Sequence, residues 1–262
     1  MLGLDLIQRR LYRAYEQSKM NSKISSEYQD KVCVITINRP EKRNALDGEM
    51  FNALAKALDQ AQDDPKVNCV LLLGRGEHFS AGHDIAAFAT LWPQPEDGAV
   101  RRMITAFAQQ TKPLVVAVTG SAIGIGATLL LHADWIVAGE TAVFKFPFAD
   151  LGIVPEAGST ALLARRVGDL VTRDWLLSAR PISATEALQR GFVSSVLPDS
   201  DVHAAAQAYA KSLAAKPAEA LRASRRLLNE ASTLPVSEAI EKEVACLNHF
   251  IPALTQRSAA KP

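Results

Sequence analysis

Apolar runs alternate with amphipathic segments along most of the chain. Runs rich in β-branched residues predict strands at residues 32–37, 67–73, 114–118, 135–138 and 142–144. Leu46, Met50, Leu54 and Leu58 recur at four-residue spacing, which predicts a helix with Asp47 as its N-cap. Because several strands are apolar on both faces, the pattern predicts an α/β fold with covered, parallel strands.

The pattern changes toward the carboxyl end, where alanine-rich helical segments follow Asp201. We therefore expect three regions: an N-terminal extension at residues 1–25, helical or disordered, a sheet-containing core at 26–200 and a helical region at 201–262. Within the core, residues 100–109 predict another helix, and 92–98 predict a loop rich in proline.

Composition and charge exclude several classes of protein. The chain has 262 residues, with 29 Lys and Arg against 28 Asp and Glu, so its net charge of +1 disfavours a nucleic-acid partner. The uncharged segment 114–131 is interrupted by Gly120, Gly124 and Gly126, which predicts strand, turn and buried helix instead of a membrane span. Residues 1–25 lack the apolar stretch of a secretory signal, so a cytoplasmic protein is expected, or an organellar one if this extension is a transit segment.

The cysteine and glycine patterns predict neither a metal site nor a nucleotide cofactor. Cys33, Cys69 and Cys246 are odd in number and widely spaced, so free thiols are expected and no zinc spacing is present. The pair Gly124 and Gly126 lacks the third glycine and the later acidic residue of a dinucleotide fingerprint.

Two segments place a backbone N–H where a strand turns into a helix. In residues 81–84 this is the N–H of His83, and in residues 120–126 it is that of Ile125. If the two donors converge, they can stabilise an oxyanion. Spacing alone leaves open the alternative that both segments are merely tight turns.

Four stretches together resemble the crotonase superfamily, the enoyl-CoA hydratases and isomerases. They are Arg39-Pro40-Glu41-Lys42-Arg43-Asn44-Ala45-Leu46, Phe79-Ser80-Ala81-Gly82-His83-Asp84-Ile85, residues 120–126 and residues 144–156. The resemblance implies a crotonase-like spiral of ββα units with a C-terminal helical oligomerisation region. It also implies a homo-trimer or a dimer of trimers, with no membrane partner. The substrate would be an acyl-CoA, with coenzyme A entering as part of that substrate and no separate cofactor.

The same resemblance assigns the site residues. The thioester oxygen would lie between the N–H groups of His83 and Ile125. Residues expected to contact the substrate are Lys42, Arg43, Ala45, Ala81, Gly82, Asp84, Ile85, Gly124, Phe148 and Pro155. Lys42 and Arg43 would lie near the nucleotide end of coenzyme A, and Arg225 is a further candidate for a phosphate contact.

The acids and bases distinguish the reactions within the family. Family hydratases use two glutamates, and the matching positions here are Thr128 and Phe148. Glu156 remains, in a segment similar to that of the peroxisomal-type Δ3,Δ2-enoyl-CoA isomerases. One base suffices for that isomerisation, so Glu156 is the expected catalytic residue, and Asp150 is a rival acid. The alternatives are an atypical hydratase, another crotonase reaction or a non-catalytic acyl-CoA-binding module.

Overall fold

The computed structural model describes residues 22–259, with side chains described through residue 252. A six-stranded sheet forms the core, in the order β1 (Ile24–Gln29), β2 (Val32–Ile37), β3 (Cys69–Gly74), β4 (Leu114–Val118), β6 (Trp135–Gly139) and β9 (Ser195–Leu197). β1 pairs antiparallel with β2, and every later pair in this sheet is parallel. The predicted α/β class with parallel strands is confirmed.

A smaller sheet stands beside the core sheet. It contains β5 (Ser121–Ile123), β7 (Val143–Lys145) and β8 (Ile182–Ser183), with β5 parallel and β8 antiparallel to β7. Only Thr119 and Gly120 separate β4 from β5, so the chain passes from one sheet to the other within this turn. β5 leads directly through Gly124 into the short helix α5 (Ile125–Thr128).

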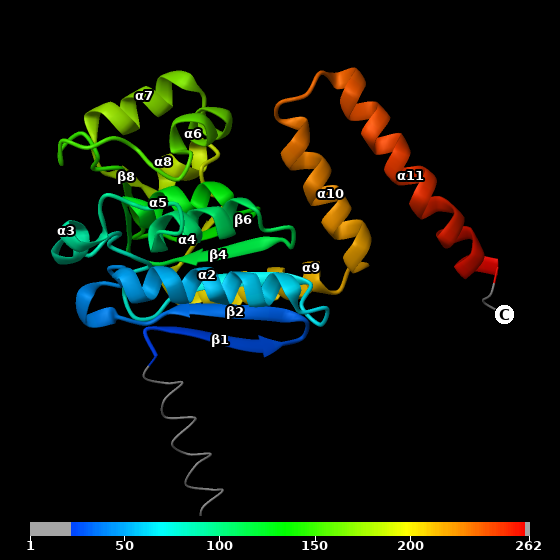
Figure 1. The fold of residues 1–262 in the computed structure, drawn as a ribbon, viewed down its shortest axis with the longest axis horizontal. Coiled ribbons are helices and arrows are strands. Elements are labelled where there is room, and N and C mark those ends of the chain that lie inside the picture. The colour runs from blue at the N-terminus through cyan, green and yellow to red at the C-terminus, as the bar shows by residue number, and fades with distance from the viewer. Residues whose placement is uncertain (1–21, 260–262) are drawn as a thin grey trace, which may run out of the picture.

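Helices cover both faces of the core sheet (Figure 1). α2 (Gly48–Asp63) and α4 (Ala99–Ala108) pack together over one face, and α9 (Val202–Ala214) packs against β3, β4 and β6 on the other. Consecutive strand residues alternate between these two layers: Cys33 belongs to the cluster under α2, whereas Val32 belongs to the cluster under α9. Since both of their faces are buried, the central strands β3 and β4 are apolar throughout, whereas the edge strand β1 is polar.

The helix starts follow local sequence signals. Asp47 caps α2, as expected, by accepting a hydrogen bond from the N–H of Met50. Ser183 caps α8 (Ala184–Gln189) by accepting one from the N–H of Glu186. The remaining short elements of the core are η1 (Pro40–Lys42), η2 (Ile85–Ala87), α3 (Phe88–Leu91), η3 (Leu129–His132), α6 (Ser159–Val167), α7 (Asp169–Ser178) and η4 (Asp199–Asp201).

The C-terminal helices α10 (Ala218–Ala231) and α11 (Val236–Ala259) project from one end of the core (Figure 1). Arg225 ties α10 to the core: its Nε lies 2.7 Å from Asp134 Oδ2, and its guanidinium also donates to the carbonyls of Gln110 and His132. Arg225 is buried and already paired. The expectation that it contacts a phosphate is therefore wrong.

Other expectations are settled more simply. The cysteines Cys33, Cys69 and Cys246 are free, as predicted. Among the described helices, none is both long and apolar enough to span a bilayer. The first strand begins at Ile24, and residues 1–21 of the expected extension lie outside the described residues.

Candidate functional site

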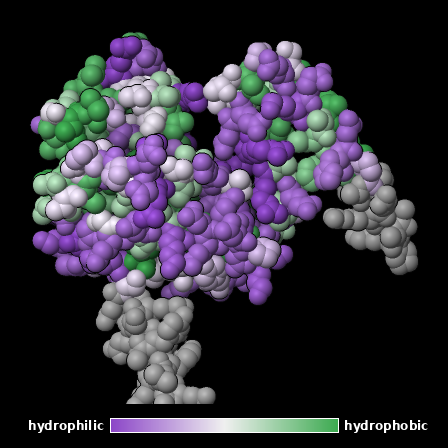
Figure 2. Space-filling view, in the orientation of Figure 1, coloured by the Kyte–Doolittle hydropathy of each residue, from purple (hydrophilic) through white to green (hydrophobic). Residues whose placement is uncertain are grey.

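A cavity of about 720 Å³ lies between the η2–α3 segment, the start of α5 and the loop that follows β7. Its walls are mainly apolar. They are formed by Ala81, His83, Ile85, Phe88, Trp92, Ile123, Gly124, Ile125, Lys145, Pro147, Phe148, Leu151, Ile153, Val154, Pro155 and Glu156. Ile85, Leu151 and Val154 are exposed, and hydrophobic surface is visible on the side of the molecule that carries α3 and α7 (Figure 2). The cavity thus offers a hydrophobic environment for a ligand.

The backbone at His83 is held by a parallel bridge to Leu46. The N–H of Leu46 donates to the carbonyl of Gly82, and the N–H of Asp84 donates to the carbonyl of Leu46. These bonds use the carbonyl before His83 and the N–H after it. The N–H of His83 itself takes no part in this bridge. Ile125 is the first residue of α5, so its N–H has no acceptor within the helix.

The two N–H segments lie against each other at Gly82. Gly82 has a φ of +86°, and a Cβ on it would lie 2.5 Å from the carbonyl oxygen of Ile123 and 3.5 Å from the amide nitrogen of Ile125. Only glycine fits this close backbone contact in that conformation. The sequence therefore brings the segment of His83 to the start of α5, as the oxyanion hypothesis requires.

Glu156 supplies the acidic group of the cavity. Its Oε1 accepts a hydrogen bond of 2.6 Å from Thr128 Oγ1, and its Oε2 is buried without a hydrogen-bond partner in the described part of the chain. Burial raises the pKa of Glu156 from 4.5 to about 7, against the lowering effect of the Thr128 hydroxyl. At neutral pH this carboxyl exchanges readily between its two protonation states.

The two positions where family hydratases carry glutamates contribute no acid. Thr128 is fully buried in α5, and Phe148 is a buried wall residue of the cavity. The rival acid Asp150 is half exposed and pairs with Lys145 at 2.8 Å. Among the described residues that line the cavity, Glu156 is thus the one carboxylate.

The side chain of His83 has a different environment from its backbone. Its ring packs between Phe51 and Phe88, with both centroid distances at 4.6 Å. Burial lowers the pKa of His83 to about 4, so the imidazole is neutral at physiological pH. Neither ring nitrogen has a hydrogen-bond partner within residues 22–259. The ring therefore acts as an aromatic wall.

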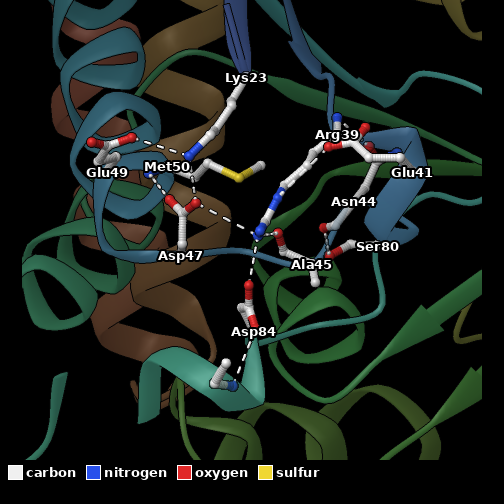
Figure 3. Close-up of polar contacts among 11 residues, drawn as sticks. Lys23, Arg39, Glu41, Asn44, Ala45, Asp47, Glu49, Met50, Ser80 and Asp84 are labelled. Atoms are coloured by element: carbon white, nitrogen blue, oxygen red, sulfur yellow. Dashed lines mark hydrogen bonds and ion pairs between the residues drawn. The ribbon is translucent and has the colours of Figure 1, made fainter. Parts of the chain in front are cut away.

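An ion-pair network supports the segment that carries His83 (Figure 3). Arg39 Nη1 donates to Asp84 Oδ2 at 2.8 Å and to the carbonyl of Ala45 at 3.0 Å, and it lies 3.5 Å from Asp47 Oδ2. Lys23 Nζ lies 2.7 Å from the same oxygen of Asp47. The Arg39 guanidinium lowers the pKa of Asp84, which keeps this pair charged. Asp84 also caps η2, so the network fixes the residue directly after His83.

Hydrogen bonds from Asn44 and Ser80 also support the segment that carries His83. Asn44 Oδ1 accepts from the N–H of Arg39, and its Nδ2 donates to the carbonyl of His78. Ser80 Oγ donates to the carbonyl of Asn44 and accepts from the N–H of Gly82. Because Asn44 and Ser80 are fully buried, these bonds join the first two motifs rigidly.

The structure brings together only part of the predicted substrate-contacting set. Ala81, Ile85, Gly124, Phe148 and Pro155 line the cavity, together with Glu156 and the predicted N–H donors. The remaining residues of that set do not line the cavity. Lys42, at the end of η1, and Arg43, which follows it, are exposed. Arg39 donates hydrogen bonds to the carbonyl of Ala45 and to the carboxylate of Asp84, and Gly82 forms the close backbone contact with Ile123.

Sequence reasoning missed two contributors. It treated Thr128 as an absent acid and gave Arg39 no role of its own, because hydrogen-bond partners 28 and 45 residues apart leave no periodic signal. The predicted loop at 92–98 and the predicted helix at 100–109 differ in their relation to the cavity. Trp92 does line the cavity, whereas α4 packs against α2 in the core and contributes no described residue to the lining.

Comparisons with known proteins agree with this geometry. The family described as Enoyl-CoA hydratase/isomerase matches residues 27–260. The chain is 33% identical to the 1,2-epoxyphenylacetyl-CoA isomerase of Escherichia coli K12, over 84% of this chain and 87% of that protein. It is 35% identical to the enoyl-CoA hydratase EchA19 of Mycobacterium tuberculosis, over 79% of this chain and 80% of that protein.

Solved structures give the same result. A protein of Magnetospirillum magneticum AMB-1 described as an enoyl-CoA hydratase/carnithine racemase superposes with a TM-score of 0.86 at 36% identity, covering 92% of this chain and 95% of that one. The relatives carry both hydratase and isomerase names, and they do not single out the peroxisomal-type isomerase branch. The fold, the four motifs and these matches show that the chain belongs to the enoyl-CoA hydratase/isomerase family of the crotonase superfamily.

Proposed function

We propose that this protein is a single-base enoyl-CoA isomerase, which moves the double bond of a 3-enoyl-CoA into conjugation with the thioester. The observation that carries the proposal is the placement of Glu156. This carboxylate lines an apolar cavity beside the backbone of His83 and Ile125, and no second carboxylate lines the described walls. One base with a pKa near neutrality suits a reaction that removes and returns one proton.

The chemistry requires one proton to move between two carbons. Glu156 takes the proton from C2, and the electron pair of that C–H bond passes into a dienolate whose negative charge rests on the thioester oxygen. The N–H groups of His83 and Ile125 would form the oxyanion hole that holds this oxygen. Protonated Glu156 then returns the proton at C4, and the double bond settles between C2 and C3.

The cavity supports this chemistry electrostatically. The neutral His83 ring and the apolar walls make the cavity a low-polarity environment, which strengthens hydrogen bonds to a developing oxyanion. Burial raises the pKa of Glu156 to about 7, so the carboxyl is a stronger base than a solvated glutamate. Lys145 is the cationic residue of the lining, and Asp150 pairs with it.

Hydration of a 2-enoyl-CoA is the alternative within the family. It needs one group to activate water and another to protonate the α-carbon. Thr128 and Phe148 occupy the positions that would supply the family's two glutamates, and neither side chain is an acid or base at neutral pH. A non-catalytic acyl-CoA-binding role is the second alternative, and retention of a buried, raised-pKa carboxylate argues against it.

An ultraviolet assay of a medium-chain 3-enoyl-CoA tests the proposal, because conjugation with the thioester changes the absorbance. The wild type should isomerise this substrate, and Glu156→Gln should lose about 10²–10⁴-fold in kcat. The variant should still bind acyl-CoA, because the amide occupies nearly the same volume. Hydration of a 2-enoyl-CoA is measured in parallel.

Each outcome of the assay separates the alternatives. Near-normal turnover by Glu156→Gln would remove Glu156 from the reaction. Hydration without isomerisation would make the protein an atypical hydratase. Tight acyl-CoA binding with no turnover on either substrate would support the binding module.

A further inference from the structure

The hydrogen bond between Thr128 and Glu156 makes the two carboxylate oxygens unequal. Oε1 accepts from the Thr128 hydroxyl at 2.6 Å, the distance of a strong charge-assisted bond. Oε2 is buried and has no partner in the part of the chain that the structure describes. One oxygen is therefore held in place, while the lone pairs of the other are unused.

We propose that Thr128 is a positioning residue: its hydroxyl fixes Oε1 of Glu156 and reserves Oε2 as the oxygen that takes the proton from C2 and returns it at C4. This inference rests on the proposed isomerase function and adds which oxygen reacts and what holds it. It also gives Thr128, which stands where family hydratases carry a glutamate, a role in the isomerisation.

The tether can persist through the whole reaction. Ionised Glu156 accepts from Thr128 at Oε1, and after Oε2 has taken the proton, Oε1 is a carbonyl oxygen that accepts the same bond. The hydroxyl does not need to rotate between the two steps. Thr128 has no exposed surface, so water does not compete for its proton.

The tether also fixes the base relative to the N–H groups. Thr128 lies on the last position of α5, and Ile125 lies on the first. The Thr128 hydroxyl is also 3.3 Å from the carbonyl oxygen of Ile125. Because one four-residue helix carries both the tether and an oxyanion donor, the distance between base and oxyanion is set within a single rigid unit.

Few other groups act on the carboxyl. The His83 ring is neutral, and Lys145 pairs with Asp150. His132, on η3, lies with Nε2 3.0 Å from the carbonyl oxygen of Ala157, and burial lowers its pKa, which favours the neutral ring. Burial raises the pKa of Glu156, and the Thr128 hydroxyl opposes that rise. Removing the hydroxyl should therefore shift the titration of Glu156 upward.

The test uses Thr128→Val, which removes the hydroxyl but keeps the side-chain volume, and Thr128→Ser, which keeps the hydroxyl. Thr172→Val is the matched control, because Thr172 is a buried threonine of α7 outside the cavity. Two quantities are measured in each protein: the pH profile of kcat and KM with a 3-enoyl-CoA, and the ¹³C NMR titration of the Glu156 carboxyl. The carboxyl signal is assigned by its loss in Glu156→Gln.

In Thr128→Val we expect kcat to fall about 10–100-fold with KM changed less than about threefold, because the base loses its position. The Glu156 titration and the acid limb of kcat should move up together by about one pH unit. Thr128→Ser should restore both, and Thr172→Val should match the wild type. If Thr128→Val does not fold, Thr128→Ala provides the same comparison.

With an active wild type, two results would overturn the proposal. In one, Thr128→Val keeps the wild-type kcat and carboxyl titration. In the other, Thr128→Val loses kcat without a change in the titration, and Thr128→Ser does not restore it, which would mean that Thr128 acts through packing alone. If the wild type isomerises no 3-enoyl-CoA, the proposed function and the reactive role of Oε2 fail together, whereas the NMR titration still decides whether Thr128 holds Oε1.

Discussion

Glu156 destabilises the folded protein at the pH where it can act as a base. Its pKa is about 7 in the fold and 4.5 in a solvated chain, so between these values the folded state binds a proton that the unfolded state has released. The free energy of unfolding therefore falls as pH rises through this window. A buried carboxyl of this kind suits the proposed proton transfer but lowers the stability of the folded state.

Glu156→Gln should remove this cost. We expect the variant to match the wild type near pH 5 and to exceed its free energy of unfolding by about 2–3 kcal/mol at pH 8, since one pKa unit corresponds to about 1.4 kcal/mol. Chemical denaturation at both pH values measures the difference, with exposed Glu27→Gln as the control. If the difference in free energy of unfolding between variant and wild type did not change with pH, burial would not raise the pKa of Glu156.

At the residue scale, sequence reasoning reached the identities but not the contacts. Glu156, His83 and Ile125 were predicted from motifs, and the structure brings all three to one cavity. The bond from Thr128 to Glu156 had no such signal, because it depends on how α5 and the loop after β7 meet in space. The catalytic roles of Glu156, His83 and Ile125 stay predictions, which the assays test.

Among the elements, local signals proved sufficient for most strands and helices. The apolar runs and the Asp47 cap are properties of adjacent residues, so they predict β2, β4 and α2 directly. Arg225 shows where this approach fails. A basic residue on a polar helix suggested a phosphate contact, but its partner Asp134 lies 91 residues earlier in the chain, and only the tertiary fold brings the two together.

Arg39 connects three elements, because it precedes η1 and pairs with Asp47 at the start of α2 and Asp84 at the start of η2. Arg39→Met removes the cation that Asp84 and Asp47 share and leaves Asp47 with Lys23, so the segment of His83 loses one of its supports. We expect the free energy of unfolding to fall by about 1–3 kcal/mol and kcat to fall about tenfold, because the proposed oxyanion donor at His83 is less well fixed.

The matched control is Arg173→Met, which breaks an exposed pair with Asp169 on α7. That change should alter stability by less than about 1 kcal/mol and leave kcat unchanged. Denaturant titration and the isomerase assay measure both variants under the same conditions. An Arg39→Met protein with wild-type kcat would show that the network supports the fold without positioning His83.

On the scale of the whole molecule, the helix layers on both faces of the sheet stabilise the core. The C-terminal helices bury less of their surface. The sheet is buried on both faces, by α2 and α4 on one side and α9 on the other. α11, in contrast, packs against α10 and stands away from the sheet (Figure 1). The sequence predicted a helical region here, and the resemblance to crotonases assigned it to oligomerisation.

The surface of α11 gives that assignment a physical basis. Val236, Ile240, Val244 and Leu247 recur at helical spacing, and each is exposed in the single chain. Hydrophobic surface lies between polar side chains on these helices (Figure 2). An apolar stripe of this kind needs a partner to exclude water, and a second copy of this chain is the partner that the family resemblance predicts.

Sedimentation velocity should therefore give the mass of a trimer or of a dimer of trimers for the wild type. Replacing Ile240 and Leu247 together by Asp should place charges on the stripe and shift the protein to monomers, because a buried charge without a counter-ion opposes association. Glu241→Gln, on the same helix, should leave the mass unchanged. A wild type that sediments as a monomer would remove the oligomeric role from α11, and its apolar stripe would then require another partner.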